Sequence, residues 1–165
     1  GVAGLDNGCC FTHARNGWGG LVEAAGGVNI GSQLLPGASG NVSVEKIISL
    51  NPDYYLMTGS KRPAKGTAII PFGYNVAESD VAAAFNALVS RQGVSSIPAV
   101  AQGHTGALYH HFYNNPYNII AIEALSKIFY PTLFNDVDPL ADYHELIKNF
   151  TQIPDDNIIL SFTPH

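Results

Sequence analysis

The densest group of side chains that could do chemistry lies in one short run, which supplies His110, His111, Tyr113 and Asn114. The run begins at the end of an expected strand over residues 107–110. Imidazole and phenol groups can bind metals or hydrogen-bond to small molecules. Adjacent residues of a strand point to opposite faces, so one histidine could face a site while the other faces the interior. We expect ligand or metal contacts at this strand end; the alternative is one core histidine followed by a turn.

A second group of reactive side chains consists of Cys9, Cys10 and His13. Such a set suggests a soft-metal or redox site, but its spacing matches none of the usual zinc signatures. A disulfide between neighbours is disfavoured, because their Cα atoms lie about 3.8 Å apart across a trans peptide and disulfides usually span about 4.4–6.8 Å. We therefore expect two separate, buried thiols.

Cations are scarce, and three of the eight lie in loops that are expected to follow strands: Arg15, Lys61 and Arg62. They could form a rim that faces an anionic ligand, or they could be ordinary solvated surface. Trp18, the only tryptophan, could be a platform for a ligand, although a core position is the more usual one.

Signatures of common enzyme classes are missing from the sequence. It contains no G-x-S-x-G elbow, no G-x-x-x-x-G-K-[ST] loop and no H-E-x-x-H motif. No pair of carboxylates stands out for acid–base work. We therefore expect a protein that is not an enzyme and carries no cofactor.

The elements that must position these side chains alternate between helices and short buried strands. Apolar periodicity, caps and prolines predict helices over residues 18–25, 44–50, 79–91, 116–129 and 139–150, and strands over 54–57 and 107–110. This order predicts a three-layer α/β/α lobe with a central, mostly parallel sheet of about four or five strands. Ligands bind at the carboxyl ends of such strands, where the loops 9–18, 59–62 and 110–115 should converge.

Composition bounds the class of protein. The chain has 165 residues, of which 46% are hydrophobic, and we interpret residues 1–165 as a single domain. Charged residues make up only 13%, about half of the usual fraction, which suggests that some surface is normally covered. The net charge of −5 argues against nucleic acid as a partner. No apolar run is long enough for a transmembrane helix.

Three segments, in order over residues 21–134, resemble the substrate-binding proteins of ABC importers for iron complexes and cobalamin. Residues 21–30 contain an "AGG-x-N" element. Residues 41–53 are similar to the family's helix–turn–strand, which ends in "PD". Residues 112–134 resemble the closing segment, with its "YP-x-x-F" motif.

The resemblance implies a two-lobed receptor that holds its ligand between α/β lobes joined by a long helix. The elements here correspond to the C-terminal lobe, so we expect the N-terminal lobe and the linker helix to be absent. The implied ligand is an iron complex (siderophore or haem), cobalamin or an oxyanion. The implied location is the periplasm, or the outer face of a membrane for a lipoprotein. Glu45 matches the carboxylate that docks on the permease, while His110, His111 and Tyr113 match cleft-facing positions only.

Two interpretations remain open at this stage. In the first, the chain is a lobe of a solute receptor. Its candidate ligand-binding residues are His13, Arg15, Trp18, Lys61, Arg62, His110, His111, Tyr113 and Asn114. In the second, it is a small metal- or redox-active domain that uses Cys9, Cys10, His13 and His110 or His111.

Overall fold

The computed structural model describes residues 9–61 and 69–164. The helices of this part are α1 (Trp18–Ala24), α2 (Gly31–Leu34), α3 (Val44–Leu50), α4 (Glu78–Val89), α5 (Pro98–Ala101), α6 (Asn118–Phe129) and α7 (Pro139–Phe150), with the 3-10 helices η1 (Val94–Ser96) and η2 (His110–Asn114). The strands are β1 (Phe11–His13), β2 (Ser39–Asn41), β3 (Tyr55–Gly59), β4 (Gly73–Tyr74), β5 (Thr105–Tyr109), β6 (Ile158–Ile159) and β7 (Ser161–Phe162).

The central sheet has the strand order β3-β5-β7. β3 and β5 run parallel, with Tyr55 opposite Thr105 and Gly59 opposite Tyr109, whereas β7 pairs with β5 antiparallel. β1 with β2 and β4 with β6 form two small antiparallel pairs. The α/β class is therefore confirmed. Within the described residues the central sheet has three strands rather than four or five, and its last strand comes from the tail, which returns along β5 in the opposite direction.

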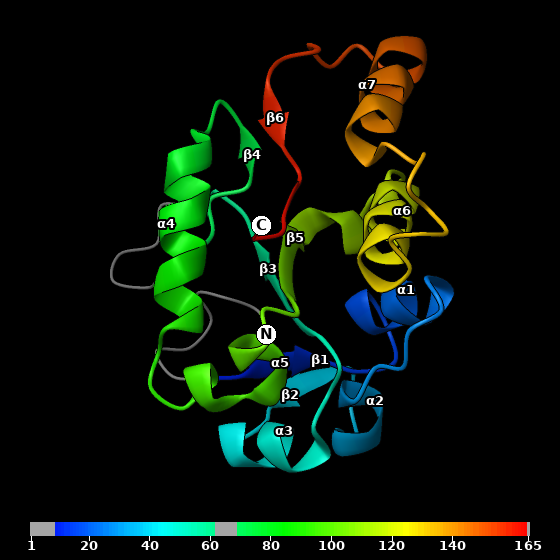
Figure 1. Ribbon diagram of the computed structural model, residues 1–165. Helices are drawn as coiled ribbons and strands as arrows, with labels where there is room; N and C mark the ends of the chain where they lie inside the picture. The colour runs from blue at the N-terminus through cyan, green and yellow to red at the C-terminus, as the bar shows by residue number, and fades with distance from the viewer. Residues whose placement is uncertain (1–8, 62–68, 165) are drawn as a thin grey trace.

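Two apolar cores cover the two faces of this sheet. Met57 and Ala107 belong to one core, and their neighbours Leu56 and Leu108 pack with the other. This division follows from the alternation of side chains along a strand. α4 lies on one side of β3 and β5, and α6 with α1 lies on the other (Figure 1). The predicted three-layer arrangement thus arises from two short buried strands.

The longer helices form where caps and periodicity predict them. Ser43 caps α3 by accepting a hydrogen bond from the backbone N–H of Lys46, and Asp138 caps α7 through Leu140 and Ala141. The start of the helix expected at Pro116 differs. Asn115 accepts a bond from the N–H of Tyr117 at 2.8 Å, and α6 begins at Asn118.

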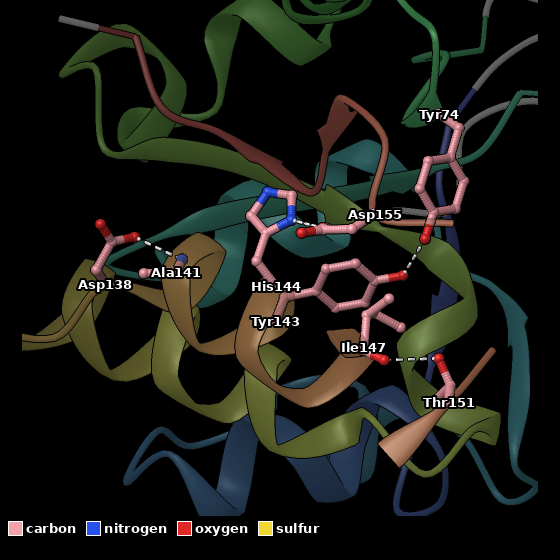
Figure 2. Close-up of polar contacts among 8 residues, drawn as sticks. All are labelled: Tyr74, Asp138, Ala141, Tyr143, His144, Ile147, Thr151 and Asp155. Carbon is pink, nitrogen blue, oxygen red and sulfur yellow. Dashed lines mark hydrogen bonds and ion pairs between the residues drawn. The ribbon is translucent and has the colours of Figure 1, made fainter. Parts of the chain in front are cut away.

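The C-terminal part is held together by side-chain contacts of α7. The hydroxyls of Tyr143 and Tyr74 lie 2.8 Å apart, which joins α7 to β4 (Figure 2). His144 pairs with Asp155 at the surface. These contacts order a tail whose sequence signal is weak, and the tail contributes β6 and β7. Among the described residues, no helix has the length and apolar character that crossing a membrane requires.

Short elements account for most differences from the sequence prediction. The sequence predicts no helix or strand over residues 31–41 or 98–101, yet these residues contain α2, β2 and α5. These pieces are too short to be stable by local propensity, so tertiary contacts hold them.

Candidate ligand-binding site

Side chains from the carboxyl ends of β1 and β5 meet in one place. The ring centroid of His13, at the end of β1, lies 5.9 Å from that of His110 and 5.7 Å from that of Tyr113. His110 and Tyr113, both in η2, have ring centroids 5.1 Å apart. We call these three residues the His–Tyr cluster.

His110 is the fixed member of the His–Tyr cluster. Its Nδ1 atom lies 2.9 Å from the Thr58 hydroxyl of β3, and both side chains are buried. The indole N–H of Trp18 donates a 3.0 Å hydrogen bond to the His110 carbonyl oxygen. Ring and backbone of His110 are therefore set by neighbours from β3 and α1.

His13 is also held in place, but its ring nitrogen is not satisfied. Its backbone carbonyl accepts a 2.9 Å bond from the Asn29 amide, and Gly31 of α2 packs directly against it. The Nε2 atom is buried and has no hydrogen-bond partner. Burial lowers the pKa of His13, which favours the neutral ring. A buried polar atom without a hydrogen-bond partner costs about 1–3 kcal/mol. The Nε2 atom of His13 is therefore suited to a partner that a ligand supplies.

Tyr113 packs its ring over a glycine. A Cβ atom at Gly17 would lie 3.0 Å from Tyr113 Cδ2, and Gly17 has a φ of +59°. Both the close approach and the backbone conformation favour glycine at this position. The loop before α1 thereby supports the phenol ring of Tyr113.

The other predicted site residues lie at different places. The ring of His111 is half-buried and contacts those of His110 and Tyr109. Trp18 is buried in the core, 5% exposed, and reaches the site only through its indole N–H. Arg15, Lys61 and Asn114 are exposed. Arg62 lies outside the described residues.

The two cysteines differ from the prediction. Cys9 and Cys10 are joined to each other in a disulfide, so the prediction of two separate thiols is wrong. That prediction assumed a trans peptide, whereas the peptide between them is cis. Both sulfurs face the Tyr55 hydroxyl.

The metal-domain interpretation thereby loses its main support. A paired cysteine is not available as a thiolate ligand. No group of three or more His, Cys, Asp or Glu side chains that could hold a metal exists within residues 9–61 and 69–164.

A cavity of about 590 Å³ adjoins the cluster. His13, Trp18 and Thr58 line it, and so do apolar side chains of α1, α3, β3 and α6. Sequence reasoning missed Thr58 and Asn29. Thr58 had one usable signal, since it is a polar residue at the end of a buried apolar strand.

The comparisons with known proteins bear on the fold of the chain. No protein-family model and no curated protein matches the sequence. Among solved structures, the chain has the fold of a lobe of TroA-like periplasmic binding proteins, as the sequence resemblance predicts.

Three of these structures are informative. The TroA-like periplasmic binding protein FepB from Veillonella parvula is 25% identical, with a TM-score of 0.87 over 99% of this chain and 48% of its own. Helicobacter pylori CeuE, in a complex with Ni-His, is 17% identical, with a TM-score of 0.63 over 93% of this chain and 45% of its own. A periplasmic heme binding protein from Pseudomonas aeruginosa is 20% identical, with a TM-score of 0.55 over 80% of this chain and 41% of its own. The chain thus spans about half the length of the structures it resembles.

Proposed function

We propose that this chain is the ligand-binding lobe of an ABC-importer solute receptor. It captures an iron complex, such as a siderophore or haem, or a related metal chelate, and passes it to the membrane permease without a chemical reaction. The observation that carries this proposal is the His–Tyr cluster, which lies at the carboxyl edge of a lobe with the TroA-like fold.

The chemistry of the cluster supports a metal chelate as the ligand. Imidazole and phenol groups bind iron, nickel, copper and zinc, and their rings also pack against planar ligands. The structures with a similar fold include one described with Ni-His and one described as heme-binding. In our proposal His13, His111 and Tyr113 touch the ligand, and the exposed Arg15 and Lys61 add positive potential at the rim.

We propose that a second lobe forms the other wall of the site. The structures of similar fold are about twice as long as this chain, which leaves room for an N-terminal lobe and a linker helix. Such a receptor would work in the periplasm or, as a lipoprotein, at the outer face of a membrane.

Ligand titrations test the proposed function. We would titrate the chain with haem, a ferric catecholate siderophore, cobalamin and molybdate, and follow the fluorescence of Trp18, whose indole is bonded to His110. We expect haem or the siderophore to bind, with weaker binding after His111→Ala or Tyr113→Ala. His104→Ala is the matched control, because His104 is exposed and stacks on Tyr54 outside the cluster. If no metal complex binds, or if His111→Ala and Tyr113→Ala both leave affinity unchanged, the proposal fails.

We further propose that Glu45 is the docking residue for the permease. It is exposed in the first turn of α3, whose Ile47 is buried and fixes the helix on the lobe. Interfacial charges mainly steer encounter and set orientation, so the effect should be on transport rate.

Uptake by whole cells that carry the complete receptor tests the docking role. Glu45→Gln should leave folding and ligand affinity intact while slowing uptake, and Glu45→Lys should slow uptake more. Lys46→Gln, one position along the same helix, is the control. Equal uptake by wild type and both Glu45 variants would exclude this role.

A further inference from the structure

We propose that the Cys9–Cys10 disulfide is a thiol–disulfide exchange site, at which an external dithiol reduces the bridge while the lobe stays folded. The inference goes beyond the proposed function, because it does not depend on any bound ligand. Cys9 and Cys10 are the only cysteines of the sequence, so the bridge is the only disulfide that the chain can form within itself. The reaction partner is a dithiol, a molecule that carries two thiols close together.

The first support is the unequal burial of the two bridged residues. Cys9 is half-buried, whereas Cys10 is 2% exposed and belongs to the apolar core. Exchange begins when a thiolate attacks one sulfur of a disulfide, so it requires access from solvent to that sulfur. The attacked sulfur is therefore that of Cys9, and the leaving sulfur is that of Cys10.

The second support is the Tyr55 hydroxyl, which lies 3.5 Å from Sγ of Cys9 and 3.7 Å from Sγ of Cys10. Bridged sulfurs carry no hydrogen, so the phenol is the donor in both contacts. When the bridge opens, negative charge develops on the leaving sulfur, and a hydrogen bond to a charged acceptor is stronger than one to a neutral acceptor. Tyr55, itself 5% exposed, is thus placed to stabilise the Cys10 thiolate inside the core.

The third support is the backbone that carries Cys10. Its N–H and its carbonyl form 3.1 Å hydrogen bonds with the carbonyl and the N–H of Val42, and its carbonyl also accepts a bond from the Thr12 hydroxyl. These bonds extend the pairing of β1 with β2, and neither sulfur takes part in them. The bridge can therefore open while the strand that carries Cys10 stays paired.

The exchange takes place in two balanced steps. One thiolate of the dithiol attacks Sγ of Cys9, the bond between Cys9 and Cys10 breaks, and its electron pair goes to Sγ of Cys10, which then takes a proton. The second thiolate of the reductant attacks the reductant sulfur of this mixed disulfide and releases Cys9, which also takes a proton. Two electrons and two protons pass to the protein, and the dithiol becomes a disulfide. A monothiol lacks the second step, so the adjacent Cys10 closes the bridge again.

The alternative is a structural bridge that is reduced only when the chain unfolds. Urea below the unfolding transition separates the two cases. It raises the population of unfolded chain steeply, and reduction through unfolding must rise with that population. Exchange in the folded state does not depend on it.

The experiment follows reduction of the chain by dithiothreitol, with glutathione at the same thiol concentration as the monothiol. The chain is produced with export to the periplasm of the expression host, where disulfides persist. Thiols are trapped with N-ethylmaleimide at successive times and counted by intact mass, in water and in sub-denaturing urea. Tyr55→Phe removes the phenol hydroxyl. Tyr54→Phe is the matched control, because the Tyr54 ring packs on His104 and Phe129 instead.

We expect no label on the denatured chain before reduction. Dithiothreitol should add two labels at a rate proportional to its concentration that changes less than about twofold in sub-denaturing urea. Glutathione should leave the bridge closed. Tyr55→Phe should slow reduction by about tenfold, and Tyr54→Phe should not slow it.

Two single-cysteine variants test which sulfur is attacked, and they stand whether or not Tyr55→Phe folds. The Cys9 thiol left by Cys10→Ala should react with N-ethylmaleimide in the folded chain. The Cys10 thiol left by Cys9→Ala should react only after unfolding, and circular dichroism checks that both variants are folded.

Five outcomes would overturn the inference. They are two free thiols before reduction, a reduction rate that rises with the unfolded fraction in urea, equal reduction by glutathione, a folded Tyr55→Phe variant with the wild-type rate, and equal reactivity of the two single thiols. None of them bears on the proposed function, which the ligand titrations test separately.

Discussion

The Thr58 hydroxyl lies 2.9 Å from Nδ1 of His110, although the two residues are 52 positions apart in the sequence. Thr58 stands near the end of β3, and His110 directly follows β5. Since these strands run parallel, their carboxyl ends meet at one edge of the sheet. The bond joins the ends of β3 and β5, and it fixes the ring of His110 within the His–Tyr cluster.

Removing this bond should destabilise the lobe. Thr58→Val keeps the shape of the side chain but leaves a buried imidazole nitrogen without its partner, which costs about 1–3 kcal/mol. Thr58→Ser should retain most of the stability, because it keeps the hydroxyl. Urea denaturation would measure both variants. Equal stability of the valine and serine variants would show that the bond contributes nothing.

Substitution of Gly31 should disturb both the fold and the site. A Cβ atom at this position would lie 2.2 Å from the carbonyl oxygen of His13, so Gly31→Ala must push α2 away from β1. We expect a loss of about 1–3 kcal/mol in stability and weaker binding of the proposed metal chelate. Gly37→Ala is the control, since nothing lies within 4 Å of its Cβ position. The explanation would be wrong if both variants matched the wild type in denaturant midpoint.

Glu123 should make stability decrease as pH rises above the ordinary carboxyl range. Burial, followed by the neighbouring Asp142, raises the pKa of Glu123 above its ordinary value of 4.5. The folded state then holds its proton more tightly than the unfolded state, so stability is lost as pH rises from the unfolded to the folded pKa.

Glu123→Gln tests this pH dependence, because it mimics the protonated carboxyl. It should stabilise the protein at neutral pH by up to about 1 kcal/mol and have little effect below pH about 4. Denaturation at several pH values would measure the difference, with Glu145→Gln, exposed on α7, as the control. A pH-independent difference would contradict the prediction.

The hydroxyl pair of Tyr74 and Tyr143 should contribute to the docking of α7. Tyr143→Phe removes a 2.8 Å bond between α7 and β4, at a cost of about 0.5–1.5 kcal/mol. Tyr74→Phe removes the same bond from the other side, so the double variant should be less destabilised than the sum of the two. Additive effects in a denaturation cycle would exclude the bond as a source of stability.

Ultraviolet absorbance during alkaline titration gives a second test of this pair. Burial, with the bond to Tyr74, raises the pKa of the Tyr143 phenol far above its ordinary value of 10.0. Tyr143 should therefore ionise only when the protein unfolds. Tyr143→Phe should reduce the absorbance step that accompanies unfolding. The absorbance change at lower pH, which comes from the other tyrosines, should stay the same.

The sequence alone determined the α/β class, the longer helices and the two central strands. These features depend on local signals: the apolar stripe of α4, the caps at Ser43 and Asp138, and the continuous apolar run that becomes β3. Each signal acts within a few residues, so it can be found by inspection of a single sequence. The family resemblance rested on sequence motifs in three segments within residues 21–134, which can likewise be read from the sequence alone.

Only the tertiary structure decided how the site is assembled. Trp18 and His110, bonded to each other, are 92 positions apart, and the sequence carries no mark of the bond. The sequence also carries no mark of three other contacts: that of His13 with Tyr113, the pairing of the tail with β5, and the packing of the short α2 against β1. The physical reason is that such contacts form only when the parallel pairing of β3 with β5 and the packing of α1 on α6 bring distant segments together, and no local propensity encodes that approach.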